Sequence, residues 1–296
     1  MEEAILRTLA YADIFDYPLK KEEIWQWLIG KQATGNKQKE VEKKLKENSF
    51  LMSRVSCLDG HCCLKGRGEI VRLREQRRGY SIKKMKLAGK VAGIMRLIPW
   101  IKMIGVTGAL AMANSDKEDD IDLLIVTSKN RLWLTRALTV FLVELVARRR
   151  RPGDQKVKDK ICLNMFLDEK HLSIPKKERD LFSAHEVCQL RPIFIRGDTY
   201  SRFLQENSWV RGFLPNVYRG LTQIKDADKR RISVNQFKNQ RSSAVEQLAK
   251  RVQLWYMRNR RTTEKITEGI IRFHPQDARE WVLKEYQARL EKLMIK

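Results

Sequence analysis

Two aspartates stand two residues apart at the start of a strongly apolar run. The stretch GVTGALAMANSDKEDDIDLLIVT (residues 105–127) begins as a turn of small residues and ends as a strand, with Asp120 and Asp122 at its head. Side chains two apart on a strand point to the same face. Two neighbouring carboxylates repel, and one stays protonated unless a cation lies between them. The spacing therefore predicts a site for a divalent cation that prefers oxygen ligands, such as Mg²⁺.

The residues on either side of this pair favour phosphate binding. The turn before it lacks bulky side chains and leads into a short helix, whose amide N–H groups can hold a phosphate. The basic residues after the strand can offset charge that develops on a triphosphate. The predicted nucleotide-binding residues are Thr107, Gly108, Ala109, Lys129, Arg131 and Arg136.

This order of apolar strand, Gly-small turn and Asp-x-Asp strand resembles the DNA polymerase β-type nucleotidyltransferase superfamily, over residues 98–170. Gly108 takes the family's glycine position, and Asp120-Ile121-Asp122-Leu123 takes its acidic motif. The resemblance implies that Asp120 and Asp122 bind a pair of Mg²⁺ ions and so hold a nucleoside triphosphate. It also implies that an acceptor hydroxyl attacks the α-phosphorus and releases pyrophosphate.

The sequence departs from the family pattern at two positions. Ala109 stands where the family usually has Ser or Gly, which removes a hydroxyl near the phosphates. The family's third carboxylate normally lies on the next strand, but the central polar residue of ICLNMFLDE is Asn164. Asn164 is therefore a candidate catalytic residue that can ligate Mg²⁺ but cannot act as a base. Asp168 and Glu169 are candidates to replace it if the strand is longer.

Hydrophobic periodicity predicts an α+β protein in which helices and strands position these residues. Three helices and a hairpin around Asp59-Gly60 indicate an N-terminal winged helix-turn-helix, and glycines are expected to break a long basic helix over 67–97. Strands are predicted at 100–106, after Asp120 and at 160–167, with a helix at 131–147 between the last two. A capping box of Ser243 and Glu246 opens a later helix. The predicted units are a winged helix (1–66), a nucleotidyltransferase-like domain (67–175) and a helical C-terminal domain (176–296).

Composition constrains the partners. The chain has 60 Lys and Arg against 36 Asp and Glu, a formal charge of +24 that attracts polyanions. This charge favours a nucleic acid as the acceptor, although a basic proteome explains it equally well. The apolar run 132–147 is shorter than the roughly 20 residues that span a bilayer and contains Arg136 and Glu144, so no membrane partner is predicted.

The cysteines indicate a reducing compartment. They form no CxxC pair and are odd in number, so reduced thiols and a cytoplasmic protein are expected. A zinc site around His61 is disfavoured because adjacent cysteines point to opposite faces of a strand. The five cysteines are Cys57, Cys62, Cys63, Cys162 and Cys188.

Two other functions remain open besides an active Mg²⁺-dependent transferase. One is a nucleotide-binding protein that keeps the fold without the chemistry. The other is a DNA-binding regulator built on the winged helix, although the mixed charges of residues 36–48 suit a solvated face better than a DNA groove. The stretch LWYMRNRRTTE (254–264) interleaves aromatics with arginines, as in single-strand binding, but a core role for the aromatics is favoured.

Overall fold

The computed structural model describes residues 1–30, 37–228, 244–258, 265–272 and 278–295. It contains a three-stranded sheet, a six-stranded mixed sheet and helices that cover both sheets. The α+β class predicted from the sequence is confirmed. Among the residues that the structure describes, no helix combines the length and apolarity needed to cross a membrane.

The N-terminal unit consists of short helices packed on an antiparallel sheet of order β1–β3–β2. Asp59 and Gly60 both have positive φ and form the predicted hairpin turn. The predicted helix over 19–30 is shorter than expected, because Leu19 and Lys20 pair with the hairpin as a strand. Its elements are α1 (Glu2–Asp13), β1 (Leu19–Lys20), α2 (Lys21–Gln26), α3 (Lys37–Glu47), α4 (Ser49–Met52), β2 (Val55–Leu58) and β3 (His61–Leu64).

A disulfide crosses this hairpin, contrary to the expectation of reduced thiols. Cys57 and Cys62 are opposite each other on β2 and β3, and their sulfurs are bonded. CxxC spacing does not cover this pair, because the hairpin register brings together two cysteines that are five residues apart. Cys63, Cys162 and Cys188 are free thiols.

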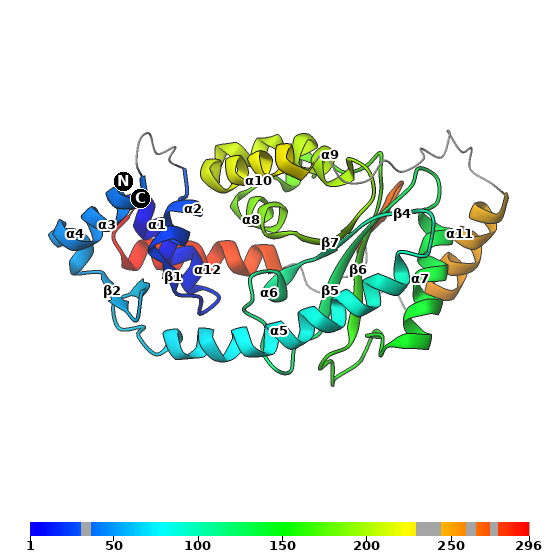
Figure 1. Ribbon diagram of the computed structural model, residues 1–296, viewed down its shortest axis with the longest axis horizontal. Helices are drawn as coiled ribbons and strands as arrows, with labels where there is room; N and C mark the ends of the chain where they lie inside the picture. Colours follow the sequence, from blue (N-terminus) through cyan, green and yellow to red (C-terminus); the bar gives the residue numbers. More distant parts are fainter. Residues whose placement is uncertain (31–36, 229–243, 259–264, 273–277, 296) are drawn as a thin grey trace.

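The long basic helix α5 (Ile70–Met95) joins the N-terminal unit to the central sheet, as Figure 1 shows. It runs unbroken through Gly79, Gly89 and Gly93, so the predicted interruptions are wrong. A glycine costs a helix about 1 kcal/mol, and packing outweighs that cost here. Ala88 and Val91 are buried against the sheet, and Arg74 forms an ion pair with Glu23 of α2.

The six-stranded sheet has the order β7–β4–β5–β6–β9–β8. Only β5 and β6 among its described pairs are parallel, and the helix α7 makes the crossover between them. The strands predicted around the acidic pair are present. The strands are β4 (Ile101–Val106), β5 (Ile121–Thr127), β6 (Ile161–Asp168), β7 (Arg191–Ile195), β8 (Lys265–Thr267) and β9 (Ile270–Arg272).

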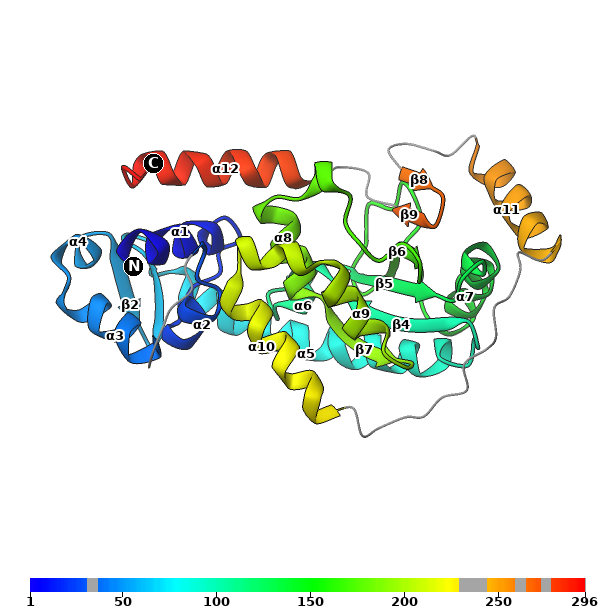
Figure 2. The same ribbon diagram turned by 90° about the horizontal axis from the view of Figure 1, so that it is seen from above.

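Helices cover both faces of this sheet (Figure 2). One core contains Leu123 and Ile125 of β5 with residues of α5, and the other contains Leu124 and Val126 with residues of α8. The remaining helices are α6 (Gly108–Ala111), α7 (Leu132–Val146), α8 (Leu181–Gln189), α9 (Thr199–Glu206), α10 (Pro215–Asp228), α11 (Ala244–Met257) and α12 (Ala278–Lys292), with 3₁₀ turns at Lys176–Glu178 and Ser208–Gly212.

The C-terminal region is not purely helical. The stretch 176–296 supplies β7, β8 and β9 to the same sheet that carries Asp122. These strands are three to five residues long, and their apolar runs are too short to be separated from helical segments by periodicity.

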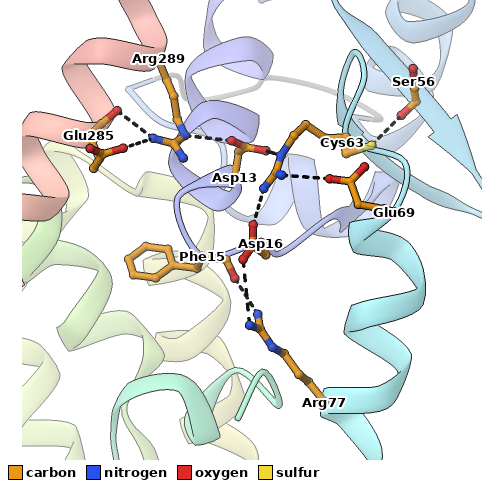
Figure 3. A network of polar contacts seen from close by, with 10 residues as sticks. Asp13, Phe15, Asp16, Ser56, Cys63, Glu69, Arg77, Glu285 and Arg289 are labelled. Atoms are coloured by element: carbon orange, nitrogen blue, oxygen red, sulfur yellow. Dashed lines mark hydrogen bonds and ion pairs between the residues drawn. The ribbon is translucent and has the colours of Figure 1, made fainter. Parts of the chain in front are cut away.

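The end of the chain packs against its beginning. Asp13 of α1 accepts hydrogen bonds from Arg289 Nε of α12 (2.8 Å) and from Arg67 Nε before α5 (2.9 Å). Glu285 holds the other side of the Arg289 guanidinium, as Figure 3 shows. Charge-assisted bonds to a buried carboxylate are strong, so Asp13 fastens three segments that are distant in sequence.

The predicted capping box includes Ser243, which lies outside the described residues. The Glu246 carboxylate accepts hydrogen bonds from the amides of Trp133 (2.8 Å) and Leu134 (2.9 Å). Glu246 thus caps α7, and this contact packs α11 against α7.

Candidate functional site

The turn between β4 and β5 places a glycine against the second aspartate. β4 and β5 are antiparallel, and the Thr107 amide donates to the Asp122 carbonyl (3.1 Å). Gly108 has φ +63°, and a Cβ built on it would lie 3.3 Å from Asp122 Oδ2. A side chain here would be strained and would crowd the carboxylate, so the glycine of the predicted motif has a physical reason. Ala109 follows, exposed, in the short helix α6.

Asp120 and Asp122 lie together, as their spacing predicted. Asp120 directly precedes β5, and Asp122 is its second residue. Asp122 Oδ1 is shielded from solvent and has no hydrogen-bond partner among the residues that the structure describes. Burial, followed by the charge of Asp120, raises the pKa of Asp122 to about 7. The pair therefore retains a proton near neutral pH unless a further cation binds.

An arginine that the sequence analysis did not select neutralises Asp120. Arg150 Nη1 donates to Asp120 Oδ2 across 2.7 Å. Its loop follows α7 and is held beside β6, because the Arg150 amide donates to the Ile161 carbonyl (2.9 Å). Arg150 belongs to the run RRRR (148–151), where composition alone does not show which arginine turns inward.

A cysteine thiol lies beside the two carboxylates. Cys162, the β6 register partner of Asp122, has its sulfur within 4.8 Å of ligand oxygens of Asp120 and Asp122. A hydrogen bond joins the thiol to Asp122, and burial together with the two carboxylates raises the pKa of Cys162 well above its usual range. Asn164 is buried two residues further along, where the register of the strands shifts. The β6 position paired with Asp122 therefore belongs to Cys162 and not to Asn164.

A further carboxyl group, that of Glu186, lies on the helix α8, which packs against one face of the sheet. Burial raises the pKa of Glu186, on α8, to about 7, and the charge of Asp122 contributes to that shift. The sequence offered no signal for it, since Glu186 is an isolated acid in a short amphipathic helix.

A buried lysine supports the segment that carries the aspartates. Lys84 of α5 donates from Nζ to the carbonyl of Asp119 (2.6 Å) and to that of Lys117 (3.2 Å). It also forms an ion pair with Asp159 (2.8 Å), from the loop that precedes β6. The Lys84 side chain thus joins two loops to the long helix α5: the loop before Asp120 and the loop before β6.

The remaining predicted cations have surroundings of their own. Lys129 follows the far end of β5, about 20 Å from Asp122 at roughly 3.3 Å per residue. The Arg131 guanidinium donates to the Asn130 carbonyl and faces the Trp100 ring, and Arg136 donates to Gln253 of α11.

The proposed substitutes for the third carboxylate lie at that far end as well. Asp168 accepts a bond from the Asn130 amide (2.8 Å), and Glu169 accepts one from the Lys129 amide (2.9 Å). Both acids organise the turn before α7. The expectation that they complete the acidic site is wrong, because β5 and β6 run parallel.

Among the described residues, the site therefore combines two carboxylates, one thiol and one arginine. Oxygen ligands suit Mg²⁺, whereas a thiol suits softer ions such as Zn²⁺. No protein-family model matches this chain, and no curated protein matches it.

Proposed function

We propose that this protein is a divalent-cation-dependent nucleotidyltransferase that moves a nucleoside monophosphate from a triphosphate to an acceptor hydroxyl. The observation that carries the proposal is the position of the Gly108 turn beside Asp122, the second carboxylate of the acidic pair. The turn leaves space beside Asp122 Oδ2, and Oδ1 of the same carboxylate is buried without a partner among the described residues. A buried carboxylate with an open oxygen is stabilised when a cation binds it.

The donor set fits a single cation between the aspartates. Asp120 and Asp122 supply oxygens, and a bound divalent ion would polarise phosphate oxygens there. Arg150 orients the Asp120 carboxylate through its 2.7 Å ion pair. Ionised Asp122 then carries the charge that attracts the ion. The thiol of Cys162 is a poor Mg²⁺ ligand, so Mn²⁺ and Zn²⁺ belong in the assay beside Mg²⁺.

On β6, the cysteine beside the aspartates is unsuited to accept the proton of the acceptor hydroxyl. Cys162 holds its proton firmly, because its pKa is raised well above the usual range. Glu186 has a pKa of about 7, which suits a proton acceptor at neutral pH.

The test is label transfer from nucleoside triphosphates in the presence of Mg²⁺, Mn²⁺ or Zn²⁺, with RNA and protein fractions as acceptors. Label from the α-phosphate should enter the acceptor, whereas label from the γ-phosphate should leave as pyrophosphate. D120N and D122N should each abolish transfer, and D198N, an exposed aspartate on another segment, should retain it. Transfer that persists in both acidic variants overturns the mechanism.

A catalytically impaired nucleotide-binding protein is the second candidate, favoured by the thiol in place of a third carboxylate. It predicts cation-dependent triphosphate binding in calorimetry, without label transfer to any acceptor. D122N should then abolish the binding.

We further propose that residues 1–66 form a winged helix that docks within the chain instead of recognising DNA. Asn216 of α10 donates to the Trp25 carbonyl of α2 (2.9 Å), and the Gly30 amide donates to the Phe213 carbonyl (2.8 Å). On α3, Lys44 forms an ion pair with Glu2 (2.8 Å). Paired lysines are unsuited to phosphate contacts. Salt-sensitive duplex binding that disappears on deleting residues 1–66 would support the regulator function and contradict this proposal.

A further inference from the structure

The helices α7 and α11 lie next to each other at one end of the molecule (Figures 1 and 2), and both carry large apolar side chains that are exposed. Trp255 is 76% exposed and Leu145 66% exposed, and neither belongs to either hydrophobic core. The core role favoured for the aromatics of 254–264 is thus wrong for Trp255 and Tyr256. We call this surface the apolar end face, and it consists of Leu138, Phe141, Leu145, Val245, Leu248, Val252, Trp255 and Tyr256.

The exposed side chains form one side of α11. Val245, Leu248, Val252 and Trp255 recur every three or four residues, so they lie along a single helical face. The opposite side is already packed, because Glu246 caps α7 and Gln253 donates to the Trp133 carbonyl (2.8 Å). The apolar residues therefore point outward from a helix whose inner contacts are satisfied.

Basic residues lie beside this face. Arg251 and Arg258 are exposed, and at 100° per residue both lie on the flank next to Trp255. Arg148, directly after α7, is exposed too. Glu246 is the one acid of α11 and is buried, and Glu144 of α7 is neutralised by Arg149 and Arg151. The surroundings of the face are therefore cationic.

We propose that the apolar end face docks in the plane of an anionic lipid membrane. Exposed aliphatic and aromatic side chains with arginines on the flank are the features of interfacial amphipathic helices. Tryptophan and tyrosine favour the boundary between headgroups and acyl chains. The arginines would contact lipid phosphates.

Two other occupants fit the same surface less well. A single-stranded nucleic acid would use the aromatics and arginines but would leave Leu145, Leu248 and Val252 in water. A second copy of the chain would bring its own arginines against those of the first. The proposal departs from the absence of a membrane partner expected from the sequence, and it is independent of the chemistry at Asp120 and Asp122.

The experiment is flotation of the full chain with vesicles of phosphatidylcholine alone or of phosphatidylcholine with phosphatidylglycerol. We expect binding to the anionic vesicles, weakened by added salt. The double variant L248Q/W255Q should bind at least about tenfold more weakly, because it removes two large apolar side chains from the contact. R251Q/R258Q should bind more weakly and with less dependence on salt.

L97Q is the matched control, because Leu97 is 73% exposed and lies outside the apolar end face. Thermal melting checks that each variant is folded. The proposal is overturned if the protein ignores anionic vesicles or if L248Q/W255Q binds them like the original chain. It is also overturned if that variant loses only single-stranded DNA binding, or only self-association in sedimentation velocity.

Discussion

Arg150 donates from Nη1 to Asp120 Oδ2 across 2.7 Å, so the loop before β6 supplies a cation to one of the two site carboxylates. Asp122 receives no such partner for Oδ1 from the described residues, and its pKa is raised to about 7. The chain thus gives Asp120 a guanidinium partner, whereas Asp122 is the carboxyl whose charge depends on a bound proton or metal ion. This asymmetry determines how the site should respond to mutation.

Replacing Arg150 should have opposite effects on stability and on metal affinity. In R150A the two carboxylates repel without compensation, which we expect to cost about 1–2 kcal/mol of unfolding free energy at pH 8. The loss should be smaller at pH 5, where Asp122 is protonated. Divalent-cation affinity should increase several-fold, because the ion no longer competes with the guanidinium. Urea titration and calorimetry measure the two quantities.

R148A is the control for this substitution, since Arg148 is exposed and belongs to the same arginine run. It should change neither quantity appreciably. A loss of both stability and metal affinity in R150A would show instead that Arg150 serves to hold the site together.

The sequence predicted the acidic pair and its glycine turn, because those features are local. Gly108, Asp120 and Asp122 lie within one hairpin-like unit of β4 and β5, where alternation and turn preference determine position. The β6 residue beside Asp122 depends on the register between strands that are 40 residues apart, and it is Cys162 and not Asn164. The register shift comes directly after the pair of Asp122 and Cys162 and leaves Asn164 outside the paired positions, and no periodicity in ICLNMFLDE signals that shift.

The prediction of three nucleotide-binding cations after β5 relied on sequence proximity alone. Lys129, Arg131 and Arg136 are near Asp122 in sequence, but a strand of seven residues separates its two ends by more than a side chain can reach. Arg150 is further away in sequence and closer in space, because the crossover through α7 returns the chain to the start of β6. Sequence proximity is therefore a poor guide to charge partners across a parallel crossover.

Stability in a metal chelator should fall as pH rises from about 4 to about 7. The folded-state pKa of Asp122, about 7, lies above its usual value, so the folded protein binds this proton more tightly than the unfolded chain does. Its contribution is complete at low pH and is lost as pH rises through the folded pKa, by on the order of a few kcal/mol. Glu186 adds a contribution of the same sign.

D122N removes the larger of these titrations and relieves Glu186 of a neighbouring charge. Its melting temperature should therefore depend less on pH, and at pH 8 without metal it should exceed that of the original chain. D198N, at an exposed position, should keep the original profile. A D122N profile as steep as the original would rule out Asp122 as the titrating group.

Cys162 should distinguish soft from hard cations. In C162S the soft donor is lost, so Zn²⁺ and Cd²⁺ affinity should fall at least about tenfold, whereas Mg²⁺ affinity should stay within a factor of about 2. Cd²⁺ binding should produce a thiolate charge-transfer band in the ultraviolet that C162S lacks. C188S should retain the band, since Cys188 is a buried free thiol on α8. Equal Cd²⁺ spectra for C162S and the original chain would place the thiol outside the ligand set.

Lys84 should be essential for stability although it lies outside the predicted site. Its ammonium group joins α5 to the carbonyls of Lys117 and Asp119 and to the carboxylate of Asp159. K84M leaves these acceptors without their donor, and we expect it to lower the free energy of unfolding by about 2–4 kcal/mol. Because Asp119 adjoins Asp120, metal affinity should fall as well. K83M, the same change at an exposed neighbour on the helix, should alter unfolding by less than about 0.5 kcal/mol. If K84M retained metal affinity while losing stability, the loop before Asp120 would be held by β5 alone, and α5 would contribute to the fold without positioning the site.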